Sequence, residues 1–176
     1  MKKWNYLPLV LMALCTSLTF VACGDDEDEP TLIIDPVMGT DEWLADSYTG
    51  TTLTDLDSRG MVMRIDTTYN QPLTIGKDSL YRLVLTYHNW TDHTGMSYGD
   101  FRILPLVTTA TDEGVLISGA CTDSLYKAGV GYPASLRVEG IVSGKEKVAD
   151  LTINIDLAVS PKMTLKFTLK YEGTAE

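Results

Sequence analysis

The chain has 176 residues, with 24 acidic and 14 basic side chains and a formal net charge of −10 at pH 7. Nucleic-acid affinity comes largely from Lys and Arg side chains that neutralise phosphates, so this balance argues against nucleic acid and against adsorption to anionic lipid. The length fits one domain with a true hydrophobic core behind an N-terminal leader.

Residues 1–22 have the pattern of a lipoprotein signal peptide. Two lysines precede an apolar stretch over residues 7–22. This stretch is shorter than the roughly 20 apolar residues of a membrane-spanning helix, and it ends in small residues. Cys23 follows where a lipobox places the cysteine that receives lipid, so we expect cleavage before Cys23 and lipidation of its side chain. The alternative is an ordinary cleaved signal in which this cysteine occurs by chance.

An acidic run follows the predicted lipidation site. Its members are Gly24, Asp25, Asp26, Glu27, Asp28 and Glu29. Consecutive acids repel one another and cannot bury apolar surface, so residues 23–46 are expected to form a disordered tether and lead-in. The run resembles the surface-export signal of lipoproteins in one phylum of anaerobic Gram-negative bacteria. That resemblance implies a protein anchored in the outer membrane through the lipid on Cys23 and exposed on the cell surface.

The other two cysteines carry no assignable chemistry. Cys15 lies within the predicted leader, and Cys121 has no neighbouring base that would activate its thiol. Cys121 is therefore expected to be buried and inert.

From residue 47 almost to the end, apolar and polar residues alternate with a period of two. The clearest segments are 151–157 and 165–171. Such alternation predicts strands with one buried and one solvated face. Further strands are expected over residues 48–56, 60–68, 71–75, 80–88, 101–109, 114–120 and 134–142.

Short turns connect these segments, without crossover helices, so neighbouring strands are expected to run antiparallel. We predict an all-β fold in which residues 47–173 form an antiparallel up-and-down barrel of about eight strands. Most connections resemble hairpins, and closure of a barrel removes exposed edges. Pro105 predicts an edge or a bulge in its segment. A two-sheet sandwich is the alternative.

Short motifs at both ends of this region resemble one family. Residues 48–50 read Tyr-Thr-Gly, residues 143–145 read Ser-Gly-Lys, and the strand-like segments 151–156 and 165–173 follow. These motifs are similar to those of the calycin-like lipoproteins of the same bacteria. The resemblance implies a lipocalin-like barrel without an established reaction. The chain departs from true lipocalins because Gly-x-Trp is absent from its first strand.

Residues 95–99 read Gly-Met-Ser-Tyr-Gly and match the nucleophile elbow of α/β-hydrolases. That elbow works between a strand and a helix, whereas a strand is expected directly after it here. His88 and His93 also precede Ser97, although the hydrolase order places the histidine last. A glycine-containing loop explains the pattern better. No catalytic residue is assigned, and the chain is not expected to be an enzyme.

Two further patterns are compatible with metal binding. His88, Asp92 and His93 could ligate zinc, but zinc sites need three or four ligands in close geometry and no further histidine exists. Residues 55–60 echo a calcium loop, but Arg59 occupies a ligand position and strands flank the segment. A solvated loop and a hairpin turn are preferred, so neither a metal nor a cofactor is expected.

The barrel itself remains as the candidate binding site. An eight-stranded barrel is either just filled by side chains or able to hold one small ligand. Six methionine and aromatic side chains could line a mouth or a cavity: Met61, Met63, Tyr81, Tyr87, Trp90 and Tyr132. Ordinary core packing is the alternative for all six.

These observations predict a non-catalytic, surface-exposed outer-membrane lipoprotein. We expect a monomer that binds a small ligand, either an apolar molecule or a glycan, or a partner through the barrel. The alternative is a structural or accessory envelope lipoprotein that docks another protein and has no small-molecule cavity.

Overall fold

The computed structural model describes residues 43–58, 60–92 and 94–176. The predicted signal peptide, Cys23 and the acidic run of residues 24–29 lie outside the described residues. No helix of the length and apolarity required for a membrane span occurs within the described part of the chain. This part is all-β and contains nine strands: β1 (Ser47–Ser58), β2 (Met61–Lys77), β3 (Leu83–Thr91), β4 (Ser97–Ile103), β5 (Leu106–Ala110), β6 (Gly114–Lys127), β7 (Val130–Ser143), β8 (Val148–Ser160) and β9 (Met163–Ala175).

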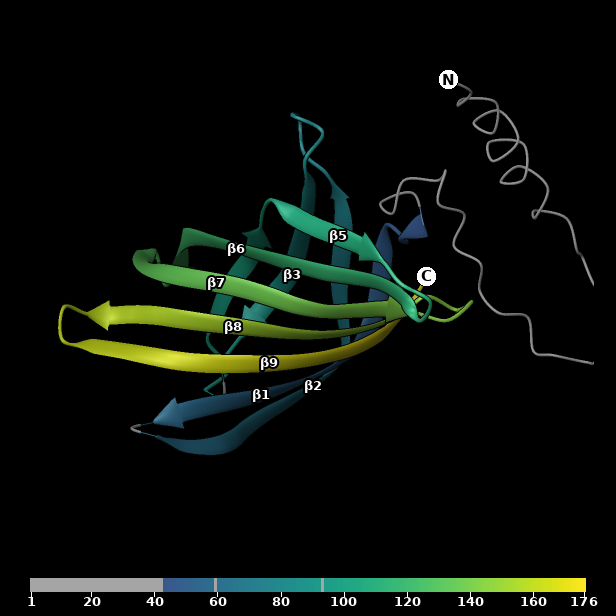
Figure 1. Cartoon of the computed structure of the whole chain (residues 1–176). Helices are drawn as coiled ribbons and strands as arrows, with labels where there is room; N and C mark the ends of the chain where they lie inside the picture. Colours follow the sequence, from purple (N-terminus) through teal and green to yellow (C-terminus); the bar gives the residue numbers. More distant parts are fainter. Residues whose placement is uncertain (1–42, 59, 93) are drawn as a thin grey trace, which may run out of the picture. The chain divides into compact units, whose positions relative to one another are not determined.

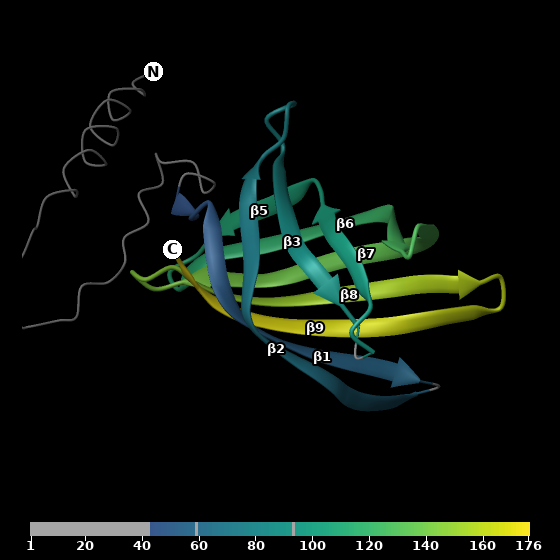
Figure 2. The ribbon, with the colours of Figure 1, turned by 180° about the vertical axis from the view of Figure 1, so that it is seen from behind.

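All nine strands belong to one antiparallel sheet, in the order β4-β3-β2-β1-β9-β8-β7-β6-β5. Sheet neighbours are also neighbours in the chain except at one place, where β1 pairs with β9. Figures 1 and 2 show the sheet curling round on itself. As a result β4, at one edge of the sheet, contacts β6. The predicted antiparallel up-and-down barrel is confirmed, with the barrel nearly closed, and the two-sheet sandwich is not formed.

The nine strands take eight positions around the barrel, because β4 and β5 are two halves of one run. β4 pairs with β3, β5 pairs with β6, and both run in the same direction. Pro105 lies between them, after a cis peptide bond from Leu104, and has no N–H to donate to a ladder. The chain therefore changes its hydrogen-bonding partner at Pro105, where the sequence predicts an edge or a bulge.

We call the junction between β4 and the second half of β6 the seam. No backbone ladder joins these two segments of the described chain, and side-chain contacts connect them instead. The thiol of Cys121 donates to the carbonyl oxygen of Arg102 at 3.4 Å. Further along the seam, Nζ of Lys127 lies 2.8 Å from Oδ2 of Asp92 and 3.4 Å from the hydroxyl oxygen of Tyr98. The barrel is thus closed here by a few polar contacts.

Inward-facing side chains fill the barrel. On β8 the four residues predicted to share one face, Leu151, Ile153, Ile155 and Leu157, have no exposed surface. Each faces inward because successive residues of a strand point to opposite sides of the sheet. The polar residues between them lie on the outer face, so the alternation predicted for this segment is confirmed.

Five aromatic rings cross the interior and pack against one another. Tyr87 stacks on Phe101 with ring centroids 5.0 Å apart, and Trp90 stacks on Tyr98 at 4.6 Å. Trp90 also makes edge-to-face contacts with Phe101 at 6.1 Å and with Phe167 at 5.2 Å. Such pairs contribute about 0.5–1.5 kcal/mol each beyond their buried area, so this cluster links β3 and β4 to the opposite wall at β9.

The barrel has two different ends. The turns after β1, β3, β6 and β8 lie at one end, called here the open end. Ser47 and Glu176 lie at the other, called here the terminal end, where the N–H of Glu176 donates to the carbonyl oxygen of Ser47 at 3.2 Å. Trp43, the first described residue, also lies at the terminal end, where Nζ of Lys147 in the β7–β8 turn is 5.8 Å from the centroid of its ring.

Candidate functional site

The apolar face of the core continues beyond the closed part of the barrel at the open end. The strands β1, β2 and β6–β9 have 12 to 17 residues, whereas β3 has 9 and β4 has 7. β3 also pairs with β2 only from Leu73 to Lys77. Inward positions of the long strands therefore extend past the wall that β3 and β4 provide. Seven side chains at these positions form what we call the open apolar face: Leu56, Met61, Met63, Val130, Tyr132, Met163 and Leu165.

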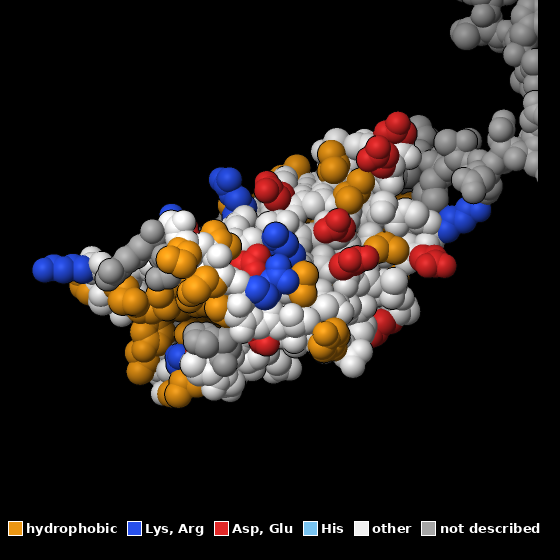
Figure 3. Space-filling view, turned by 90° about the horizontal axis from the view of Figure 1, so that it is seen from below, with side chains coloured by type: hydrophobic (Ala, Val, Ile, Leu, Met, Phe, Trp, Pro, Cys, Tyr) orange, Lys and Arg blue, Asp and Glu red, His pale blue; other side chains and the backbone are white. Residues whose placement is uncertain are grey.

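Four members of the open apolar face are largely in contact with solvent. The exposed fraction is 64% for Met61, 45% for Met63, 54% for Val130 and 52% for Met163. The other three are partly buried and pack against the core. Figure 3 shows hydrophobic side chains gathered at one end of the domain, with charged side chains spread over the rest of that view. Grouped apolar exposure of this kind marks interaction sites, and methionine adapts readily to differently shaped partners.

The structure brings together only some of the six residues predicted to line a mouth or cavity. Met61, Met63 and Tyr132 belong to the open apolar face. Tyr87 and Trp90 are 1% and 2% exposed and form part of the aromatic core. Trp90 reaches Phe167, whose cross-strand neighbours are Leu56 and Ile155, so it lies beneath the open apolar face.

Tyr81 lies far from the other five, at the terminal end. It is 84% exposed and occupies the turn between β2 and β3, with φ of 59°. The carboxylate of Asp78 organises this turn by accepting hydrogen bonds from the backbone N–H groups of Leu80 and Arg82, both at 2.9 Å. The strand therefore begins at Leu83 and not at residue 80, and Tyr81 does not share a face with Tyr87.

Two buried polar groups in the aromatic core have different environments. The hydroxyl of Tyr87 donates to Oγ1 of Thr52 at 2.9 Å, and burial raises the pKa of Tyr87 to about 12. The indole Nε1 of Trp90 has no hydrogen-bond partner among the described residues. An unpaired buried donor costs about 1–3 kcal/mol, so Nε1 is a group that an oxygen atom reaching the core would satisfy.

Asp92 is the best-connected charge at the open end. Besides the Lys127 ammonium, its carboxylate accepts hydrogen bonds from the N–H of Thr94 at 2.9 Å and the N–H of Met96 at 3.2 Å. Burial of Asp92 acts to raise its pKa, but these hydrogen bonds outweigh burial and lower the pKa to about 2. Asp92 therefore holds the β3–β4 turn against the end of β6.

His88 lies in a hydrogen-bonded chain of three side chains. Its Nδ1 is 3.0 Å from Oδ2 of Asp100, and its Nε2 is 3.2 Å from Oγ1 of Thr74. With the ring proton on Nδ1, the Thr74 hydroxyl donates to Nε2, which is the order of contacts in a nucleophile–base–acid triad. None of the principal hollows of the described chain is lined by these residues. The contacts therefore orient the imidazole across β2, β3 and β4.

The remaining motifs singled out in the sequence lie in turns. Ser97 begins β4, and its Oγ accepts a hydrogen bond from the N–H of Gly99 at 3.0 Å. Oδ1 of Asp57 accepts the N–H of Gly60 at 2.8 Å and so organises the β1–β2 turn. His93 lies outside the described residues, and no cluster of three His, Cys, Asp or Glu side chains suited to a metal ion occurs among the described ones.

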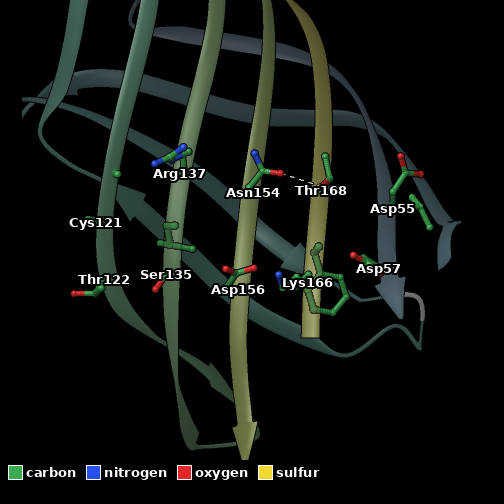
Figure 4. Close-up of a pocket in the computed structure, with 14 residues that line it drawn as sticks. Asp55, Asp57, Cys121, Thr122, Ser135, Arg137, Asn154, Asp156, Lys166 and Thr168 are labelled. Atoms are coloured by element: carbon green, nitrogen blue, oxygen red, sulfur yellow. Dashed lines mark hydrogen bonds between the residues drawn. The ribbon is translucent and has the colours of Figure 1, made fainter. Parts of the chain in front are cut away.

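A groove of about 840 Å³ crosses the outer face of the barrel, over β1, β9, β8, β7 and β6. Its outward-facing side chains, all but one of them polar, stand in two rows set by the strand register (Figure 4). The first row is Asp55, Thr168, Asn154, Arg137 and Ala120. The second row is Asp57, Lys166, Asp156, Ser135 and Thr122. We call this site the outer groove.

Charges in the outer groove differ in how they are paired. Asp55 is buried at one margin, where hydrogen bonding from Arg64 lowers its pKa and Lys170 lies 3.7 Å away. By contrast, neither Arg137 nor Lys166 has a carboxylate oxygen within 4.0 Å among the described residues. Alternation predicts polar residues at these positions, but it does not predict which of them the strand pairing places side by side.

Comparison with known proteins gives no relative from which a function could be transferred. No family model, no curated protein and no solved structure matches the chain.

Proposed function

We propose that this protein is a lipid-anchored, cell-surface binding protein without catalytic activity, and that it captures an apolar segment of another envelope protein on the open apolar face. The observation that carries the proposal is the position of that face. Large apolar side chains of three hairpins stay exposed at the end of the barrel opposite Ser47 and Glu176. A tether that enters at the terminal end leaves this face directed away from the point of attachment.

Two features favour a macromolecular partner over an enclosed small ligand. The interior of the barrel is occupied by the aromatic cluster around Trp90. The open apolar face extends over β1, β2, β7 and β9 and is open on the side that β3 and β4 do not cover. A broad, open surface suits the anchoring side chains of a protein partner, which concentrate binding energy in a few buried apolar contacts.

The unpaired Nε1 of Trp90 favours a second candidate function, in which the face holds a small amphiphile. An oxygen atom of such a ligand would accept the indole N–H once the ligand reached the aromatic cluster. The two candidates differ in what co-purifies with the protein: another envelope protein or a small molecule.

Photo-crosslinking on intact cells tests the proposal. A photoreactive residue at Met63 is expected to join the protein to one defined envelope protein. The matched control is the same residue at Val107, which is 60% exposed on β5 but lies outside the face. Replacing Met61, Met63 and Met163 by threonine should abolish complex formation, measured by co-purification. Equal crosslinking from Met63 and Val107 would contradict the proposal.

Native mass spectrometry of the purified protein separates the two candidates. A protein that carries no bound small molecule and binds the crosslinked partner supports protein capture. A co-purified small molecule that is lost in the triple threonine variant supports the amphiphile instead.

A further inference from the structure

We propose that the outer groove is a binding site for a neutral oligosaccharide. The proposal concerns a different surface from the open apolar face and does not depend on it. It rests on the hydrogen-bonding chemistry of the two rows, on the balance of their unpaired charges and on the shape of the groove.

The hydrogen-bonding chemistry of the groove alternates along the rows. The carboxylates of Asp57 and Asp156 only accept hydrogen bonds, whereas the cationic groups of Arg137 and Lys166 only donate them. Hydroxyl and amide side chains, which do both, complete the rows: Ser135, Thr122, Asn154 and Thr168. Among them, the hydroxyl of Thr168 donates to Oδ1 of Asn154 at 3.0 Å, which leaves the amide N–H groups of Asn154 for a ligand. A sugar hydroxyl both donates and accepts, so adjacent hydroxyls of one sugar ring can each find a complementary group here. In Figure 4 these side chains project from neighbouring strands into one site.

The outer groove has equal numbers of unpaired positive and negative side chains. Arg137 and Lys166 have no carboxylate within 4.0 Å among the described residues, and within the same limits Asp57 and Asp156 have no cationic partner. The groove therefore carries two free charges of each sign, although the whole chain has a net charge of −10. A strongly anionic or cationic ligand would meet two like charges at close range. A neutral ligand with many hydroxyls avoids this repulsion and uses all four groups.

The dimensions of the groove fit an extended chain of sugars. A volume of about 840 Å³ lies within the roughly 300–1,000 Å³ typical of ligand sites. Neighbouring strands are about 4.8 Å apart, so five strands give a length of about 19 Å. Sites for apolar ligands are lined mainly by hydrophobic side chains, whereas nine side chains of this groove are polar or charged. An elongated, polar groove on a rigid sheet thus suits an oligosaccharide better than a compact apolar molecule.

Binding of the purified full chain to an array of neutral and acidic oligosaccharides tests the proposal. We expect binding to at least one neutral oligosaccharide. Asp156→Ala and Arg137→Ala should each lower its affinity about tenfold, because each removes charge-assisted hydrogen bonds. Both residues are exposed, so the melting temperature of both variants should match that of the unmodified chain.

The matched control is Asp150→Ala, which removes an exposed carboxylate from the outer face of the same strand but outside the groove. It should leave the affinity unchanged. No binding to any neutral oligosaccharide, or binding to acidic ones alone, would overturn the proposal. The proposal would also be overturned if Asp156→Ala and Arg137→Ala bound the oligosaccharide with the affinity of the unmodified chain. If either variant melts early, Asp156→Asn replaces the first and Arg137→Gln the second, and both keep the shape of the site.

Discussion

Truncation of the buried Phe167 side chain should destabilise the barrel more than truncation of a side chain on the outer face of the barrel. Phe167 is 3% exposed, packs edge-to-face against Trp90 at 5.2 Å, and pairs across the sheet with Leu56 and Ile155. Replacing a buried Phe by Ala costs about 3–5 kcal/mol of unfolding free energy, which includes the cavity left behind. Leu56 is only partly buried, so water can reach this site from the open apolar face and part of the cavity cost is avoided. We therefore expect a loss of about 3–4 kcal/mol for Phe167→Ala.

Urea unfolding followed by tryptophan fluorescence measures this loss, because Trp90 reports directly on the contact. A drop of 3–4 kcal/mol corresponds to a melting temperature lower by about 10–15 °C for a domain of this size. The matched control is Thr168→Ala on the outer face of the same strand, expected to cost less than about 1 kcal/mol. A loss below 1 kcal/mol for Phe167→Ala, with an unchanged denaturant slope, would refute the assignment of Phe167 to the core and the description of a filled barrel.

Two further predictions concern the charge that closes the seam and the lipid anchor. Asp92→Asn should cost about 2 kcal/mol at pH 7, because the folded-state pKa of Asp92 is about 2 and the unfolded value is 3.8. A depressed carboxyl pKa stabilises the fold above pH 4 and loses that effect as the pH falls toward 2, so urea midpoints of variant and unmodified chain should converge there. A constant difference between pH 7 and pH 2 would disprove the role of this ionisation. Cys23→Ala should abolish acylation and release the protein from membranes in a fractionation assay, whereas unchanged membrane retention would rule out the anchor.

Local patterns were sufficient to predict the architecture of the barrel. The alternation over residues 151–157 predicts one buried face, and the structure buries each of its four apolar side chains. Such alternation follows from strand geometry alone, since successive side chains point to opposite faces. The hairpin turns then determine that neighbouring strands pair, which leads to an up-and-down barrel.

Features that depend on distant pairing were harder to predict. The alternation over residues 80–88 groups Tyr81 with Tyr87, but the carboxylate of Asp78 accepts hydrogen bonds from the backbone N–H groups of Leu80 and Arg82, and the resulting turn delays the start of the strand to Leu83. The outer groove requires the pairing of Asp57 with Lys166 between the first and last strands, which no local pattern contains. Whether an eight-stranded barrel is filled or hollow depends likewise on which aromatic rings meet across it. Trp90 and Phe167 meet only once β3 and β9 are on opposite walls.

The ladder between β1 and β9 has a consequence for how the chain folds. Every other ladder joins strands that are close in the chain, so those hairpins can form as soon as both arms are available. The ladder from Tyr48 opposite Ala175 requires nearly the whole domain. Closing so long a loop is slow, and until it closes the facing edges of β1 and β9 are unpaired and can pair with other chains. A chain that emerges N-terminus first therefore cannot complete its barrel before its last residues arrive, and loss of β9 would leave two reactive edges instead of a slightly smaller protein.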